Sequence, residues 1–287
     1  MDSLTTSVTD GVRFYDGGWQ SDVSEVVVLV HGLGNSLNFW AGVAPRVSEH
    51  TRVVALDLPG FGGSRLPRLG FSLESITDDV ATFLKRRGVN RCRVVGHSLG
   101  AIVAMAIASR RPEMVSRLVL VDGTLISANK SLANAAYAVR HPILALNVAA
   151  QFAGGVIPMN EATIGLLLSS GFLRRILLWP FVASPSLVDG ELLRVALAGN
   201  RGGLGVLRIL RAVRETGSLD LMRRVVQPVD LLWGSNDRLI PERDIVWSRA
   251  TLSVERELVL DNCGHWPLIE RPEAVADFLI SGMETLR

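Results

Sequence analysis

Short apolar runs rich in β-branched residues recur along the chain, and segments with helical periodicity separate them. The runs are nearly continuous, as expected for strands that are buried on both faces of a parallel sheet. They lie at 25–32, 51–60, 92–98, 116–123, 228–237 and 256–265. Helical patterns lie between them at 38–48, 74–87, 99–110, 241–251 and 272–285. The alternation predicts an α/β fold with a mostly parallel central sheet and helices on both faces.

The alternation is interrupted once, over residues 127–215. This stretch contains apolar, helix-like segments broken by Pro and Gly, and it shows no clear strand. We therefore expect a helical cap inserted into a core domain formed by 1–126 and 216–287. Residues 141–160 carry no Asp, Glu, Lys or Arg and are nominally long enough to cross a bilayer. The Pro, Gly, Asn and Gln residues within them favour a pair of short buried or lid-like helices instead.

Composition excludes several function classes. The chain has 287 residues, and its 30 basic and 28 acidic residues form no sustained basic stripe, so no nucleic-acid partner is expected. Cys92 and Cys263 make no disulfide framework, and no Cys/His cluster has the spacing of a zinc site. The first residues, MDSLTTSVTDG, lack the basic and apolar regions of a signal peptide, so we expect a cytoplasmic protein.

The stretch VVGHSLGA, residues 94–101, places a serine between two glycines where a strand pattern changes to a helix pattern. So sharp a turn holds its central residue in a strained backbone conformation. Gly96 and Gly100, two positions to either side of Ser98, remove Cβ atoms that would collide there. An exposed serine at such a turn is the arrangement of the G-x-S-x-G nucleophile elbow, which makes Ser98 the candidate nucleophile.

Two further polar residues follow predicted strands. Asp237 comes directly after LLWGSN, and His265 comes directly after LVLDNCG. In open α/β sheets, ligands bind beyond the carboxyl ends of the strands. Ser98, Asp237 and His265 are therefore expected to lie together at that edge.

The chain resembles the α/β-hydrolase superfamily in five segments that occur in the family's order. They are HGLG after the first long strand, DLPGFGGS after the next, GHSLG at the elbow, GSND before the acid and CGHWPLIERPEAV around the histidine. The resemblance extends from about His31 to Trp266, and the order Ser, Asp, His along the chain is also that of the family. The 127–215 insertion matches the position of the family's helical cap.

The resemblance implies a Ser-His-Asp mechanism, which requires neither a metal nor an organic cofactor. In it, Ser98 is the nucleophile, His265 the general base and Asp237 the acid that orients the imidazole. The backbone N–H groups of Leu33 and Leu99 are expected to form the oxyanion hole. Asp122, at the end of LVLVDG, is an alternative acid, although GSND is the better match.

Three other side chains have structural interpretations. His31 is expected to buttress the oxyanion turn, His97 to pack beside the elbow, and Cys263 to be a small buried residue. The loop around Asp57 fits a tight turn that supports the site.

The apolar cap is the segment that bears on the substrate. It favours a hydrophobic small molecule over a sugar or a peptide, and the serine at the elbow excludes relatives that use an aspartate there. We expect a serine hydrolase that cleaves a carboxylic ester or thioester through an acyl-enzyme intermediate. The alternatives are carbon–carbon bond hydrolysis of a vinylogous diketone, a tailoring hydrolase or acyltransferase of secondary metabolism, and a non-catalytic small-molecule receptor. No stable membrane insertion is expected, whereas transient membrane contact through the cap and the oligomeric state stay open.

Overall fold

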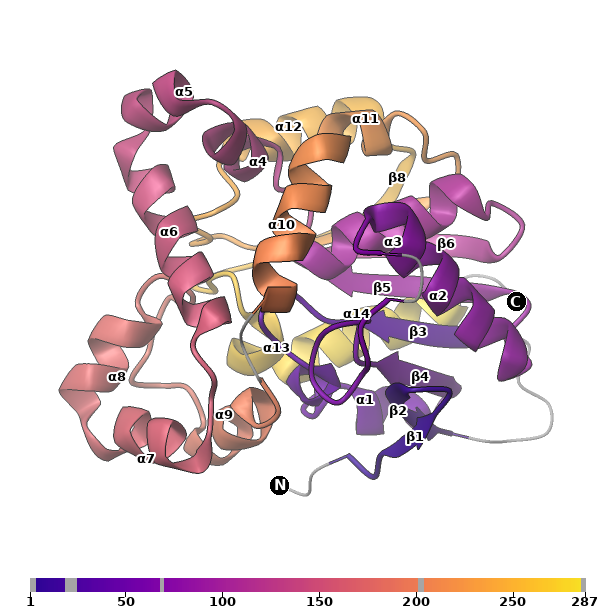
Figure 1. Ribbon diagram of the computed structural model, residues 1–287, viewed down its shortest axis with the longest axis horizontal. Helices are drawn as coiled ribbons and strands as arrows, with labels where there is room; N and C mark the ends of the chain where they lie inside the picture. The colour runs from indigo at the N-terminus through magenta and orange to yellow at the C-terminus, as the bar shows by residue number, and fades with distance from the viewer. Residues whose placement is uncertain (1–3, 19–24, 68–69, 201–203, 285–287) are drawn as a thin grey trace.

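The computed structural model describes residues 4–18, 25–67, 70–200 and 204–284, and one sheet organises them (Figure 1). Eight strands of these residues form it in the order β1-β2-β4-β3-β5-β6-β7-β8, and neighbours from β4 to β8 are parallel. The strands are β1 (Ser7–Thr9), β2 (Val12–Gly17), β3 (Val26–Val30), β4 (Arg52–Leu56), β5 (Cys92–His97), β6 (Val115–Val121), β7 (Val229–Gly234) and β8 (Val254–Leu260). The α/β prediction is confirmed, and β3 to β8 are the six predicted strands.

The antiparallel hairpin of β1 and β2 forms one edge of the sheet, and the sequence interpretation did not predict it. Its two strands are joined by Asp10 and Gly11, which have φ angles of 55° and 79°. An Asp-Gly pair with both φ angles positive suits the tight hairpin turn that matches the twist of the flanking strands. The signal was present in the sequence, but β1 is only three residues long and fully exposed, so it shows no hydrophobic alternation.

Helices cover both faces of the sheet (Figure 1). On one face the hydrophobic core includes residues from α2 (Leu73–Arg86), α3 (Leu99–Arg110), α11 (Ser218–Met222) and α12 (Glu242–Thr251). On the other it includes residues from the 3-10 helix η1 (Leu37–Trp40), α1 (Ala44–Ser48), α13 (Pro267–Glu270) and α14 (Pro272–Glu284). The predicted helix at 38–48 is corrected to η1 and α1. Pro45 explains the break, because a residue without an N–H suits the first turn of a new helix.

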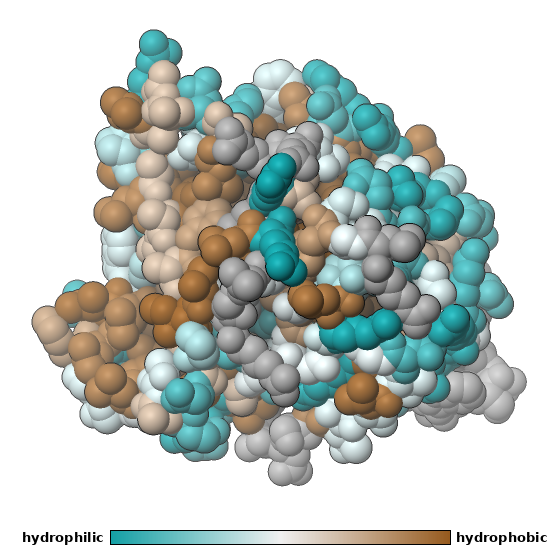
Figure 2. Space-filling model, viewed as in Figure 1, coloured by the Kyte–Doolittle hydropathy of each residue, from teal (hydrophilic) through white to brown (hydrophobic). Residues whose placement is uncertain are grey.

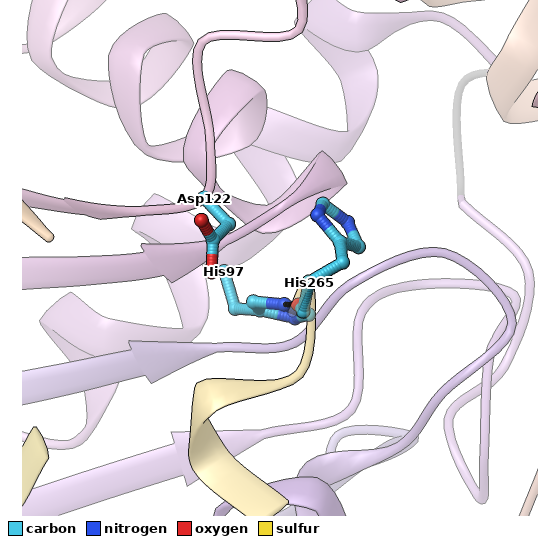
Figure 3. Close-up of side chains that lie close together, drawn as sticks. All are labelled: His97, Asp122 and His265. Carbon is cyan, nitrogen blue, oxygen red and sulfur yellow. Dashed lines mark hydrogen bonds between the residues drawn. The ribbon is translucent and has the colours of Figure 1, made fainter. Parts of the chain in front are cut away.

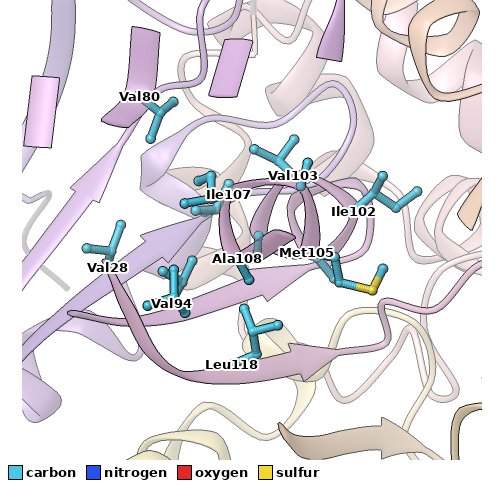
Figure 4. Close-up of a cluster of buried hydrophobic side chains, with 14 of the residues drawn as sticks. Val28, Val80, Val94, Ile102, Val103, Met105, Ile107, Ala108 and Leu118 are labelled. Carbon is cyan, nitrogen blue, oxygen red and sulfur yellow. The ribbon is translucent and has the colours of Figure 1, made fainter. Parts of the chain in front are cut away.

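The helix α3 lies in the middle of the helices that cover the first face of the sheet. Every residue from Leu99 to Ala108 is buried, because α3 lies between the sheet on one side and α2 and α11 on the other. Figure 4 shows Met105 of this helix close to Leu118 of β6. Burying side chains of this size stabilises a fold by about 1.5–3 kcal/mol each. The core therefore fixes the start of α3, where Ser98 lies.

A helical insertion lies between β6 and α11 along the chain. It consists of α4 (Ile126–Ala133), α5 (Ala135–Arg140), α6 (Pro142–Val156), α7 (Glu161–Ser169), α8 (Gly171–Leu178), α9 (Gly190–Leu197) and α10 (Leu204–Thr216). Between residues 126 and 216 no strand forms in the part that the structure describes. Figure 2 shows hydrophobic side chains gathered over α6 to α8. The exposed hydrophobic residues of these helices include Ile143, Leu146 and Phe172. Transient membrane contact through this surface stays a prediction.

The expected pair of helices at 141–160 is wrong: one helix, α6, spans most of the stretch. Pro142 lies in its first turn, where the missing N–H costs no hydrogen bond, and Pro158 follows its end. Gly154 and Gly155 lie in its last turn and allow close packing. A Cβ built on Gly34, in the loop after β3, would lie 2.2 Å from the Cα of Gly155. No helix among the described residues is both long and apolar enough to span a membrane.

The contact between Gly34 and α6 generates a stability prediction. Gly34→Ala should lower the free energy of unfolding by at least about 1 kcal/mol, because alanine is strained at the φ of 69° that Gly34 adopts and its Cβ would collide with α6. Gly165→Ala in α7 is the control, since a Cβ there meets nothing within 4 Å. It should raise stability by about 0.5–1 kcal/mol. Chemical denaturation measures both, and equal effects would contradict the proposed contact.

Candidate active site

Ser98 occupies the turn between β5 and α3. Its φ of 54° and ψ of −120° lie in a region that costs a non-glycine residue of order 1–3 kcal/mol. The flanking glycines permit this turn, because a Cβ on Gly96 would lie 2.4 Å from the Gly100 carbonyl oxygen. A Cβ on Gly100 would lie 2.3 Å from the Val30 carbonyl oxygen. The turn therefore lifts Ser98 off the sheet while the backbones on either side stay in close contact.

A continuous line of hydrogen bonds runs from Ser98 to Asp237. The Ser98 Oγ lies 2.8 Å from Nε2 of His265, and Nδ1 of His265 lies 2.7 Å from Oδ2 of Asp237. Asp237 is held in place because its Oδ1 accepts the backbone N–H groups of Leu239 and Ile240, at 2.7 and 3.3 Å. The structure thus brings together the three residues that the sequence predicts, from three different strand ends.

A second buried carboxyl group lies behind this line. Asp122, directly after β6, is fully buried and accepts a hydrogen bond from the Gly234 N–H at 3.1 Å. Burial and the negative charge of Asp237 raise the pKa of Asp122 well above its ordinary value. Burial alone would also raise the pKa of Asp237, but His265, the Leu239 N–H and Asp122 outweigh it and lower that pKa. A proton is therefore favoured on Asp122 over Asp237, and Asp237 is the carboxylate that faces His265.

Asp122, His97 and His265 also form a cluster with the residue types of a metal site (Figure 3). Each offers a ligand atom, and these atoms lie within 4.8 Å of one another. However, Nδ1 of His265 is bonded to Asp237 and Nε2 to Ser98. A metal ion would have to break one of these bonds, so the cluster fits a hydrogen-bonded site better than a metal centre.

His97 does more than pack beside the elbow. Its ring stacks on Phe39 with the ring centroids 5.3 Å apart, and its Nε2 donates a hydrogen bond to the His265 carbonyl oxygen at 2.7 Å. Burial lowers the pKa of His97 to about 3, so the ring is neutral. His97 therefore positions the backbone of His265, a role that sequence spacing could not reveal because the two residues are 168 positions apart in the chain.

Glu270 is a further positioning residue that the sequence interpretation missed. Its carboxylate accepts the N–H of Gly264 at 2.7 Å and the N–H of Ala183 at 2.8 Å. It thereby joins the loop that carries His265 to the segment between α8 and α9. Cys263 in the same loop is buried, as expected, and burial raises the pKa of its thiol, so it is no thiolate. The signal for Glu270 was its place in CGHWPLIERPEAV.

Leu33 and Leu99 both lie close to Ser98. The loop after β3 packs on the elbow so closely that a Cβ on Gly32 would lie 3.2 Å from the Ser98 Cβ. Leu99 is the first residue of α3, where an N–H has no intrahelical acceptor and the helix dipole favours negative charge. Ser98, Leu33 and Leu99 all line one cavity. This arrangement suits an oxyanion between the two backbone N–H groups.

Two buried side chains hold the loop that carries Leu33. Nε2 of His31 accepts the Leu58 N–H at 3.0 Å, and burial lowers the pKa of His31, so the ring is neutral and able to accept. Asp57 accepts the N–H groups of Leu37 and Gly63 at 2.6 and 2.7 Å. The loops after β3 and β4 are therefore tied together beneath the site.

Two apolar cavities lie above the sheet, one on each side of α6. The smaller, of about 70 Å³, is lined by Ser98 and by residues of α3, α4, α6 and α10. The larger, of about 350 Å³, is lined by residues of α6 to α9, by Trp266 and by Asn35. Among the residues that the structure describes, only Leu33 and Gln151 line both cavities.

Known proteins are similar to this chain in sequence and in fold. The model of a family described as "Alpha/beta hydrolase family" matches residues 27–278. An uncharacterized protein of Mycobacterium bovis is 27% identical over 281 residues, which cover 90% of this chain and 75% of that protein. The "Putative carbamate hydrolase RutD" of Enterobacter cloacae is 28% identical, over 92% of this chain and 93% of its own. In fold, the chain is similar to a meta-cleavage product hydrolase from Pseudomonas fluorescens, with a TM-score of 0.71, 20% identity and 99% coverage of both chains.

The two carboxyl groups generate a prediction about Ser98. Asp237→Asn should slow the reaction of Ser98 with a fluorophosphonate by about 10⁴-fold, because the amide leaves His265 in the wrong tautomer. Asp122→Asn should slow it far less, since the asparagine keeps the shape of Asp122 and can still donate a hydrogen bond to Asp237. The measurement is the rate at which the fluorophosphonate labels Ser98 in each purified variant. The reverse ranking would make Asp122 the acid.

Proposed function

Since the chain belongs to the alpha/beta hydrolase family, we propose that it hydrolyses carboxylic esters or thioesters of hydrophobic compounds through an acyl-enzyme on Ser98. The observation that carries the proposal is the line of hydrogen bonds from Ser98 Oγ through His265 to Asp237. A serine hydroxyl is a weak nucleophile at neutral pH and needs an adjacent base, which His265 supplies. The Asp237 carboxylate orients the imidazole and stabilises it when it is charged.

The proposed reaction has two balanced steps. Ser98 Oγ attacks the carbonyl carbon while its proton passes to Nε2 of His265, and the N–H groups of Leu33 and Leu99 stabilise the oxyanion. The bond from the carbonyl carbon to the alkoxy oxygen or thiol sulfur breaks, and the leaving group takes the proton from His265. Water then attacks the acyl-enzyme, gives one proton to His265 and releases the acid, and Ser98 regains its proton.

The lining of the two cavities supports a hydrophobic, uncharged substrate. None of their described lining residues is Asp, Glu, Lys or Arg. A dienoate diketone, the substrate class for carbon–carbon hydrolysis, carries a carboxylate, and burying that charge without a cationic partner is costly. The cavities therefore favour an ester or thioester over the vinylogous diketone.

The same proposal includes the division of the chain into a core and a cap, and the location of the protein in the cell. Residues 127–215 would act as the cap of a core formed by 1–126 and 216–287, which is supported by the helices α4 to α10, because α4, α6 and α10 line the same cavity as Ser98. The cytoplasmic location expected from the sequence is part of the proposal, and the two cysteines are free and buried, in keeping with it.

The nucleophile is tested by labelling. A fluorophosphonate should label the wild type, and Ser98→Ala should abolish labelling and lower kcat by about 10⁴-fold or more. Ser109→Ala is the control, since Ser109 lies near the end of the same helix and bonds only to the Ala106 carbonyl oxygen. It should label like the wild type. Labelling that persists in Ser98→Ala would place the nucleophile elsewhere.

The type of bond that is cleaved is tested by measuring the turnover of an ester, a thioester, a dienoate diketone and a carbamate. Octyl acetate and S-octyl thioacetate should be hydrolysed, and a dienoate diketone should not. A carbamate belongs in the panel because one relative bears the name of a carbamate hydrolase. Labelling of Ser98 without turnover of any of the four would favour the receptor alternative, and preferred cleavage of the diketone would overturn the ester proposal.

A further inference from the structure

We propose that α6 separates the two halves of the ester: the small cavity takes a short acyl group, and the large cavity takes a bulky apolar leaving group. This inference rests on the proposed ester hydrolysis and deepens it. It assigns the hydrocarbon of the substrate to the alcohol or thiol side of the scissile bond.

The sizes of the two cavities differ enough to sort the halves. A protein cavity of ~150 Å³ accommodates benzene. The small cavity, at about 70 Å³, has half that volume and holds roughly three carbon atoms. The large cavity, at about 350 Å³, exceeds twice that volume. A long hydrocarbon chain is therefore buried more completely in the large cavity than in the small one.

The positions of the site residues orient the substrate. Ser98 and Leu99 line the small cavity and do not line the large one. Trp266, which directly follows His265, lines the large cavity and stacks on Phe181 with ring centroids 4.4 Å apart. The leaving group must reach His265 because that residue returns the proton to it. The large cavity is therefore on the leaving-group side, and the small cavity is on the acyl side.

The junction of the cavities is where the ester would lie. Leu33, whose N–H faces the oxyanion in the proposed mechanism, lines both cavities, and so does Gln151 of α6. Gln151 Nε2 is buried and has no hydrogen-bond partner in the described part of the chain. Buried donors are nearly always paired in native proteins, so an unpaired one calls for an acceptor. An oxygen of a substrate that passes from one cavity to the other would supply it.

Two isomeric esters test the inference directly. Octyl acetate and ethyl octanoate have the same atoms and nearly the same hydrophobicity, but the long chain lies on opposite sides of the carbonyl group. Each methylene that leaves water can raise kcat/KM about fourfold. Octyl acetate should therefore have the higher kcat/KM, by at least about tenfold. A preference for ethyl octanoate, or equal values, would overturn the inference and leave the ester proposal intact.

A matched pair of variants tests the large cavity. Ala150 lines it, whereas its neighbour Ala149 is exposed and lines neither cavity. Ala150→Phe should lower kcat/KM for octyl acetate by at least about tenfold, because the ring fills the cavity, and should change ethyl acetate less than about twofold. Ala149→Phe should change neither. An equal loss for both esters in Ala150→Phe would mean that the cavity does not hold the alcohol.

The junction is tested with Gln151→Leu, which removes the donor and keeps the approximate size. It should lower kcat/KM for both isomers and leave fluorophosphonate labelling of Ser98 unchanged. An unchanged kcat/KM would remove Gln151 from the site. If the wild type hydrolyses neither isomer although Ser98 is labelled, the ester proposal itself fails, an outcome distinct from equal hydrolysis of both.

Discussion

The close contact of backbones around Ser98 is the constraint on which the site depends. The elbow exists only because Gly96 and Gly100 leave room for the carbonyl oxygens beside them. The strained φ of Ser98 is retained because β5 and α3 are buried on all sides and cannot relax independently. The energy of the core, far larger than the strain, thus holds one hydroxyl group in an otherwise unfavourable position. The loop with Leu33 can approach that hydroxyl because Gly32 also lacks a Cβ.

A second constraint is electrostatic. Two carboxyl groups, Asp122 and Asp237, are buried next to one imidazole, and like charges at close range disfavour double ionisation. The protein resolves this by distributing hydrogen bonds unequally. Asp237 accepts two backbone N–H groups and faces His265, whereas Asp122 accepts one backbone N–H. These contacts raise the pKa of Asp122 and lower that of Asp237, which favours the negative charge on the carboxylate that orients the base.

The helix α6 connects these constraints with the substrate. Its last turn rests on the loop that carries Leu33, through the contact of Gly155 with Gly34. The same helix contributes Gln151 to the wall between the two cavities. Any movement of α6 would change the shape of both cavities and the support of the proposed oxyanion hole together. Binding of the hydrocarbon and the geometry of the reaction are thus physically coupled in the proposed function.

The sequence by itself determined the strands from β3 to β8, the buried helix α3 and the strand ends at which Ser98, Asp237 and His265 lie. These follow from local hydrophobic periodicity and from glycine spacing, which depend on neighbours along the chain. The short exposed hairpin, the break between η1 and α1 and the single helix α6 were not predicted, because each depends on a turn or a contact that outweighs the local pattern. Only the tertiary structure showed that His97 bonds to the His265 carbonyl oxygen and that Glu270 holds the loop that carries His265. It also showed that the pKa of Asp122 is raised whereas that of Asp237 is lowered. Such roles arise through burial or between segments 87 to 168 residues apart in the chain. Local periodicity encodes neither proximity in space nor the loss of water.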